Sequence, residues 1–186
     1  MAAITETGIY QCRIVPVSAN RDERGCLYEI YRKSWPGAFD TVQWNACASS
    51  AGVVRGVHVH VDYHEFYTLP RGQVVVGLID IRRESPTFMR SMQFEWSDQD
   101  GIAITVPVGV AHVIYFRTDS VLAFGLSDYW RADLDVIGCQ WDDPALKFDW
   151  TGCADRRSER DRTSGSLAQM IADYEAKRLE LAGAAV

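Results

Sequence analysis

The stretch that decides the fold is Gly52-Val-Val-Arg-Gly-Val-His58-Val-His60-Val-Asp-Tyr-His-Glu65-Phe-Tyr-Thr-Leu-Pro-Arg-Gly72. Its β-branched and aromatic residues predict two strands, 53–61 and 65–69, joined by a short polar segment. Side chains two residues apart in a strand point to the same side of the sheet, so His58 and His60 face the same way. Because polar groups inside a barrel are costly without partners, this histidine pair predicts a functional site.

Short runs of the same kind recur from Gly8 to about Trp150. Turn-forming segments separate them, and this regular spacing is typical of a β-sandwich or barrel. The last segment changes to helical spacing, which predicts a helix over 164–182 that packs on the barrel exterior, with Ser166 and Gln169 as a capping box. We expect strands at 9–17, 26–31, 41–46, 53–61, 65–69, 73–81, 92–96, 102–106, 111–116 and 121–129.

The composition predicts one folded domain over residues 1–186, because 47% of the 186 residues are hydrophobic and 24% are charged. A net charge of −6 argues against a nucleic-acid partner. Five scattered cysteines without a Cys-x-x-Cys pair predict a reduced, cytoplasmic protein. There is no apolar run of about 18 residues and no leader pattern, so no membrane association is expected.

The spacing of the glycines, histidines and glutamate in the quoted stretch resembles the first metal-binding motif of the cupin superfamily. A partial second motif follows as Gly101, Pro107, Gly109 and His112, with Phe116 in place of its final Asn. This resemblance implies a divalent transition metal bound by His58, His60, Glu65 and His112. Such ligands suit Fe(II), Mn(II), Ni(II), Cu(II) or Zn(II).

A longer set of motifs points to a different chemistry. In order along the chain they are Asp22-Glu-Arg24-Gly25, Tyr28-Glu29, Gln43-x-Asn45, Arg55-Gly-Val-His58, Asp80-Ile-Arg82-Arg-x-Ser85-Pro86-Thr87, Pro107-x-Gly109-x-Ala111-His112, Trp141-x-Asp143-Pro144 and Ser158-Glu-Arg-Asp161-Arg162. Together they resemble the dTDP-4-dehydrorhamnose 3,5-epimerase family. The resemblance implies an all-β cupin jelly-roll barrel with a C-terminal α-helix, a homodimer without a cofactor, and a nucleotide-diphosphate sugar as substrate in deoxysugar biosynthesis.

Epimerisation next to a ketone needs a base, a group that stabilises the enolate, and an acid on the opposite face. The resemblance implies that His58 is the base and Asp161 its partner. A carboxylate on one ring nitrogen fixes the tautomer and raises the basicity of the other nitrogen. The implied substrate-binding residues are Arg24, Glu29, Gln43, Asn45, Arg55 and His112, with both arginines on the diphosphate.

Three positions depart from the family pattern. Phe124 stands at the catalytic Tyr, Glu65 at a Lys that helps to neutralise the enolate, and Ala46 at a His. A phenyl ring delivers no proton, and a carboxylate opposes a developing oxyanion unless it is protonated or bound to a cation.

These departures leave three hypotheses. The first is an epimerase for a dTDP-4-keto-6-deoxyhexose that acts at one carbon, with water or another residue as acid, or that accepts a changed substrate. The second is a metal-dependent oxygenase or isomerase with Glu65 as a ligand. The third is a sugar-nucleotide-binding barrel that has lost catalysis, although the retained pair of His58 and Asp161 counts against it. The length of the ordered motif match favours the epimerase.

Overall fold

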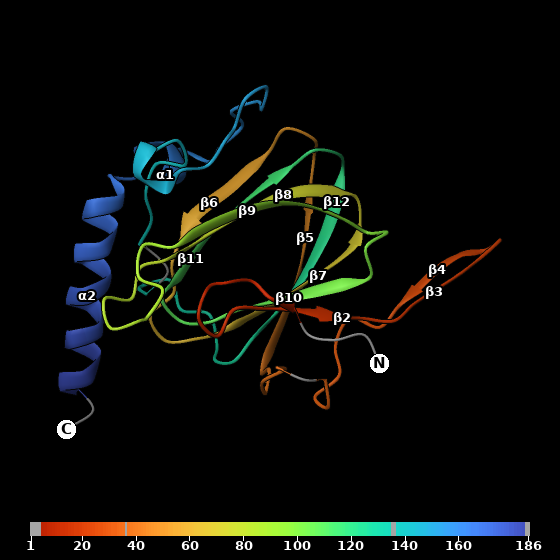
Figure 1. The fold of residues 1–186 in the computed structure, drawn as a ribbon, viewed down its shortest axis with the longest axis horizontal. Helices are drawn as coiled ribbons and strands as arrows, with labels where there is room; N and C mark the ends of the chain where they lie inside the picture. The colour runs from red at the N-terminus through yellow and green to blue at the C-terminus, as the bar shows by residue number, and fades with distance from the viewer. Residues whose placement is uncertain (1–4, 36, 135–136, 185–186) are drawn as a thin grey trace.

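Two antiparallel sheets face each other and form a barrel in the computed structural model, which describes residues 5–35, 37–134 and 137–184 (Figure 1). The six-stranded sheet runs in the order β1 (Thr5–Glu6), β2 (Arg13–Pro16), β10 (Ile102–Val106), β7 (Glu65–Arg71), β12 (Ser120–Leu126) and β5 (Gln43–Ser49). The four-stranded sheet runs in the order β6 (Val54–His58), β11 (Val110–Phe116), β8 (Gln73–Asp80) and β9 (Ser91–Ser97). A separate hairpin of β3 (Ala19–Asp22) and β4 (Gly25–Tyr28) projects away from the barrel.

Every predicted strand overlaps a strand of the structure. The strand predicted at 102–106 coincides with β10, and the ends of the others differ. The predicted strand at 9–17 is shortened to β2 because Cys12 N donates to Ile9 O at 3.0 Å and Gln11 has a φ of 65°, so the chain turns there. The two short strands β1 and β3 were not predicted. The residues of β3 are polar and mostly exposed, and they lack the apolar alternation that marks a half-buried strand.

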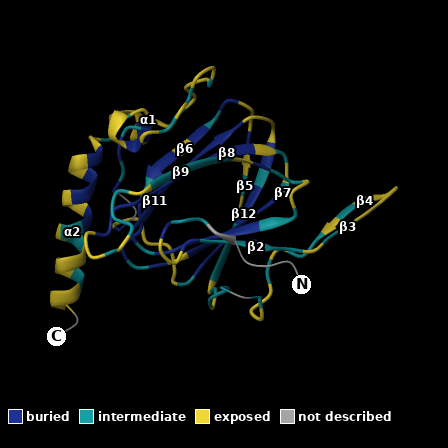
Figure 2. Cartoon of the chain, in the orientation of Figure 1, coloured by how far each residue is buried: buried dark blue, intermediate teal, exposed yellow. Residues whose placement is uncertain are grey.

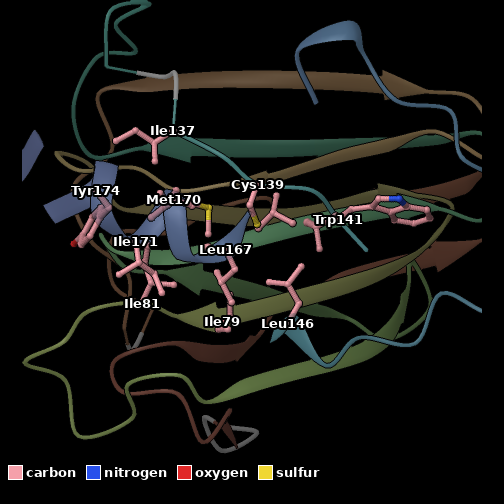
Figure 3. Close-up of a cluster of buried hydrophobic side chains, with 14 of the residues drawn as sticks. Ile79, Ile81, Ile137, Cys139, Trp141, Leu146, Leu167, Met170, Ile171 and Tyr174 are labelled. Atoms are coloured by element: carbon pink, nitrogen blue, oxygen red, sulfur yellow. The ribbon is translucent and has the colours of Figure 1, made fainter. Parts of the chain in front are cut away.

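The four-stranded sheet is covered on both faces, so nearly every residue of β8 and β11 is buried. Its inner face contributes to a cluster between the two sheets that includes Leu78, Ile114 and Phe116. Its outer face packs against helix α2 (Leu167–Ala184), and Figure 3 shows Ile79 and Ile81 beside the helical side chains. The helical residues of this outer cluster are Leu167, Met170, Ile171 and Tyr174. The opposite side of the helix is exposed (Figure 2).

Helix α2 begins three residues later than predicted and ends at Ala184 instead of residue 182. Ser166 Oγ accepts from Gln169 N at 3.2 Å, as in a capping box, but the Gln169 side chain donates to Asp173 at 2.8 Å and does not return to the helix start. Asp143 Oδ2 accepts from Leu167 N at 2.8 Å and supplies a second cap. No helix within the described residues is long and apolar enough to cross a membrane.

A short helix, α1 (Glu159–Thr163), lies in the charged run before α2. Ser158 is its N-cap and accepts from Asp161 N at 3.1 Å, and this cap turns the Asp161 side chain inward. Asp161 is buried although its neighbours in the helix are charged and exposed. Asp161 is therefore an inward-facing carboxylate within an otherwise exposed charged run.

A buried carboxylate at the end of β8 explains the motif at residues 80–87. Asp80 is fully buried and accepts hydrogen bonds from both Nε and Nη2 of Arg82 at 2.8 Å, from Ser85 Oγ at 2.5 Å and from Thr87 Oγ1 at 2.6 Å. Burial alone raises the pKa of Asp80, but these hydrogen bonds outweigh burial and lower it. The motif therefore stabilises a loop, since none of its residues lines the cavity described below.

We expect Asp80→Asn to lower the free energy of unfolding by about 3 kcal/mol or more at pH 7, because it leaves the buried Arg82 guanidinium without its counter-charge. The folded-state pKa of Asp80 is depressed, so its stabilisation is fully present above an unfolded-state pKa of about 3.9 and is lost as the pH falls below it. Urea unfolding from pH 7 to pH 3 measures this difference. Glu95→Gln, at an exposed carboxylate, is the control and should unfold like the wild type. Equal stabilities of the wild type and Asp80→Asn at pH 7 would contradict this account.

Candidate active site

A cavity of about 900 Å³ opens between the two sheets and contains most of the predicted site residues. Strands β5, β7 and β12 of the six-stranded sheet form one wall, and β6 and β11 of the four-stranded sheet form the opposite wall. The segment that carries α1 lies at the cavity as well. The polar and aromatic residues of the lining are Gln43, Asn45, Arg55, His58, His60, Tyr63, Glu65, Tyr67, His112, Phe124, Trp130, Arg156, Arg157, Ser158, Arg160 and Asp161.

His58 and Asp161 form a dyad in this cavity. His58 Nε2 lies 2.7 Å from Asp161 Oδ1, although the two residues are 103 positions apart in the chain. Burial raises the pKa of Asp161, but the hydrogen bond and charge of His58, together with a side-chain hydrogen bond from Ser158, lower it further than burial raises it. An ionised carboxylate only accepts hydrogen bonds, so Nε2 carries the hydrogen and Nδ1 keeps its lone pair. Nδ1 of His58 is therefore the basic atom of the dyad.

A second cluster joins the two walls of the cavity. Glu65 Oε2, on β7, lies 3.4 Å from Nε2 of His60 and 3.4 Å from Nε2 of His112. All three side chains are buried. Burial lowers the pKa of His60 well below its ordinary value, and the neighbouring histidines add to this effect, so His60 is neutral at pH 7.

Two tyrosines accompany this second cluster. Tyr67 Oη lies 3.1 Å from Nε2 of His112, and the Tyr63 ring stacks on His60 with centroids 4.3 Å apart. Tyr67 and His112 belong to opposite sheets, so their hydrogen bond crosses the cavity.

The four residues of the predicted metal set do not form one group. His60, Glu65 and His112 each offer a ligand atom within 4.8 Å of the other two. His58 is bound to Asp161, and its ring centroid lies 6.4 Å from that of His112. The structure thus divides the predicted set into a cluster of three and a separate dyad.

The three positions at which the sequence predicts a departure from the family pattern all line the cavity. Phe124, on β12, pairs with Tyr67 of β7, and the two ring centroids are 5.7 Å apart. Ala46, on β5, lies in the same wall, next to the strand that carries Phe124. Glu65 belongs to the cluster described above.

Four of the six predicted substrate-binding residues line the cavity, namely Gln43, Asn45, Arg55 and His112. Arg24 and Glu29 do not line it in the single chain, and their role in substrate binding stays a prediction. Arg24 lies at the tip of the β3–β4 hairpin with 83% of its side chain exposed, and it pairs with Asp22. Glu29 follows β4 and pairs with Arg32. The hairpin projects from the barrel (Figure 1) and carries Arg24 at its tip, whereas Glu29 lies at its base beside Thr68 and Leu69 of β7.

Three arginines that the sequence analysis left unassigned replace them at the cavity: Arg156, Arg157 and Arg160. Arg157 is held by Asp155 at 2.6 Å and by Gln140 Oε1 at 2.6 Å, while Arg156 donates to Ala51 O at 2.7 Å. Together with Arg55 they give one end of the cavity a positive charge that suits an anionic group. Their proximity to Asp161 in the sequence could have predicted these residues. A segment that places one side chain in the cavity also places its sequence neighbours close to it.

The facing sheets, the enclosed polar cavity and the histidine–carboxylate dyad define an enzyme of the cupin class. A family profile described as dTDP-4-dehydrorhamnose 3,5-epimerase matches residues 6–169. The chain therefore belongs to the dTDP-4-dehydrorhamnose 3,5-epimerase family and is an epimerase. The predicted cupin barrel with a C-terminal helix is confirmed.

Individual relatives agree with this assignment. The dTDP-4-dehydrorhamnose 3,5-epimerase of Mycobacterium tuberculosis is 31% identical over 163 residues, which cover 81% of this chain and 80% of that protein. The protein of the same name from Sinorhizobium fredii is 28% identical over 164 residues, covering 83% of this chain and 84% of the relative. The crystal structure of dTDP-6-deoxy-D-glucose-3,5-epimerase from Legionella pneumophila, in complex with dTDP-4-keto-L-rhamnose, has a TM-score of 0.82 at 27% identity. That alignment covers 92% of this chain and 96% of the other.

Proposed function

We propose that this protein inverts a carbon next to the 4-keto group of a dTDP-4-keto-6-deoxyhexose, with His58 as the base. The observation that carries the proposal is the 2.7 Å bond between His58 Nε2 and Asp161 Oδ1 inside the cavity. Asp161 holds the ring in the tautomer whose Nδ1 accepts a proton from carbon. Removal of that proton leaves an enolate, and return of a proton to the other face inverts the centre.

The size and charge of the cavity support a nucleotide-diphosphate sugar as substrate. A volume of about 900 Å³ is at the upper end of the range for small-molecule sites, which suits a ligand made of a base, two sugars and a diphosphate. The arginines of the lining provide charge-assisted donors for the diphosphate, and the amides of Gln43 and Asn45 provide neutral polar groups that suit a sugar.

We propose Tyr67 as the acid that returns the proton. His58 belongs to the four-stranded sheet and Tyr67 to the six-stranded sheet, so the two side chains approach a bound sugar from opposite walls. Tyr67 is the cross-strand neighbour of Phe124. Its phenol can donate a proton from the same wall, whereas the phenyl ring of Phe124 cannot. The Tyr67 Oη lies 3.1 Å from Nε2 of His112, which positions the phenol at the cavity.

Deuterium incorporation tests the function. The protein is incubated with dTDP-4-keto-6-deoxyglucose in D2O, and proton NMR follows the C3 and C5 positions of the sugar against an enzyme-free sample. We expect exchange with inversion at C3, C5 or both, and the labelled position identifies the carbon. Binding of the nucleotide sugar without exchange at either carbon would refute the proposal and favour a binding barrel.

The Tyr67→Phe variant tests the acid in the same assay. It should still exchange a proton by way of His58, but inversion should fall by about 10²-fold or more because the proton returns to the face from which it left. Unchanged inversion would show that another group is the acid.

We further propose that the protein is a homodimer in the cytoplasm. The projecting hairpin exposes 69% of Leu27 and carries Arg24 away from its own cavity, which supports a role for the hairpin in contact with a second chain. All five cysteines are free, as expected in a reducing compartment. Light scattering on the intact protein measures the oligomeric state, and a monomer at all concentrations would contradict the dimer.

A further inference from the structure

We propose that His60, Glu65 and His112 bind a divalent transition-metal ion inside the substrate cavity. The three residues come from three different parts of the fold: the loop after β6, the first residue of β7 and the middle of β11. Their ligand atoms converge at one point of the cavity lining. Such a metal departs from the cofactor-free chemistry that the family resemblance implies.

The distances fit a metal ion. In a tetrahedral site with metal–ligand bonds of about 2.1 Å, neighbouring donor atoms lie about 3.4 Å apart. The two distances from Glu65 Oε2 to the histidine Nε2 atoms are both 3.4 Å, and the remaining nitrogen–nitrogen distance is no more than 4.8 Å.

The chemistry of the donors fits as well. Two imidazoles and one carboxylate form a donor set that zinc enzymes and non-haem iron enzymes use, and such sites keep positions open for substrate. The carboxylate is buried beside two imidazoles, and a divalent ion would offset its charge in a region where a bare negative charge is costly.

Tyr67 shares one of the donor atoms. Its Oη lies 3.1 Å from Nε2 of His112, so an ion bound to that nitrogen replaces this hydrogen bond and leaves the phenol beside the ion. His58 is not among the residues whose ligand atoms converge, and its Nε2 is bound to Asp161. The base and the metal ligands are therefore separate groups in one cavity.

The position of the site suggests its use. A bound ion acts as a Lewis acid and places positive charge where a carbonyl oxygen becomes an enolate oxygen. Glu65 would then contribute to oxyanion stabilisation through the ion it holds, although its own charge is negative. This use rests on the proposed epimerase function, whereas the binding of the ion does not.

The experiment measures metal binding directly. Untagged full-length protein is treated with a chelator, dialysed and titrated with Zn²⁺ and Co²⁺ by calorimetry, and the visible absorption of Co²⁺ is recorded. We expect one ion per chain and a Co²⁺ spectrum typical of nitrogen and oxygen ligands. Glu65→Gln and His60→Gln should each weaken binding by more than about 100-fold, since loss of a second-shell partner alone costs 10- to 100-fold. Circular dichroism checks that both variants fold.

His58→Asn is the matched control, because it changes a cavity histidine outside the donor set. It should bind the ion with wild-type affinity. Absence of binding to the wild-type protein, or equal binding by the wild type and both ligand variants, would overturn the site. The deuterium exchange assay is run in parallel on metal-loaded and metal-free protein. Metal binding without deuterium exchange would support the metal site and refute the proposed function. Deuterium exchange without metal binding would refute the metal site and support the proposed function.

Discussion

His58→Asn is expected to lower the rate of deuterium exchange into the 4-keto sugar by about 10²- to 10⁴-fold, the usual contribution of a general base. The amide has no basic nitrogen, so nothing at this position accepts the proton from carbon. Asp161→Asn should also cause a large loss, about 10²-fold or more, because its amide donates to Nε2 of His58 and forces the hydrogen onto Nδ1.

Binding of dTDP separates this effect from a loss of structure. The arginines that suit the diphosphate come from the β6 strand and from the segment next to α1, and neither substitution removes them. Calorimetry should therefore give the same affinity for dTDP with both variants as with the wild type. Exchange at the wild-type rate in His58→Asn would assign the base to another residue.

Gly72→Ala is expected to lower the free energy of unfolding by about 3 kcal/mol or more, combining backbone strain with steric overlap. Gly72 has a φ of +107°, which L side chains rarely adopt. An added Cβ would lie 2.0 Å from Ser120 Oγ and 2.8 Å from Ser120 Cα, so the backbone at the start of β12 would have to move. Urea unfolding monitored by fluorescence measures the loss.

Gly152→Ala is the control for this substitution. Gly152 also has a positive φ, +75°, but an added Cβ meets nothing within 4 Å. The free energy of unfolding of Gly152→Ala should fall by only about 1–2 kcal/mol, which is the cost of placing an L side chain in the left-handed conformation. Equal losses at Gly72 and Gly152 would mean that the overlap with Ser120 is relieved without cost.

Local patterns were enough to predict the strands and an all-β sandwich or barrel, and the family resemblance then specified the cupin barrel. Strands such as β7 and β11 are short apolar runs between turn residues, and their type depends on neighbours in sequence. The hairpin strand β3 escaped prediction because it is polar and exposed and pairs only with β4. The turn at residues 9–12 escaped because its residues are apolar and resemble a strand.

The site could be predicted only in part, since its members meet through long-range contacts. The pairing of His58 with Asp161 spans 103 residues, and no spacing rule connects them, so the pair came from the family resemblance. The division of the histidines into two groups follows from the α1 helix, which brings a carboxylate to His58 alone. The partnership of Tyr67 and Phe124 depends on the register of β7 with β12, which a sequence does not state.

The family motifs also have different physical meanings. Asp80 and Arg82 lie in a motif that matches the family closely, yet they stabilise a loop outside the cavity. Asp143, in another such motif, caps the start of α2. A motif match therefore identifies the family reliably, whereas the catalytic role of each matching residue has to come from its place in the fold.

The position of Asp161 has a consequence for how this enzyme is made. The barrel strands end at Leu126, but the partner of the base lies 35 residues later, in a short helix that follows them. When the ribosome has synthesised all the barrel strands, it has not yet synthesised Asp161, the residue that orients His58. A nascent chain that stops before Asp161 thus contains all the barrel strands and Arg55 but lacks the carboxylate that completes the dyad. Activity then begins late in synthesis, after the barrel strands are complete.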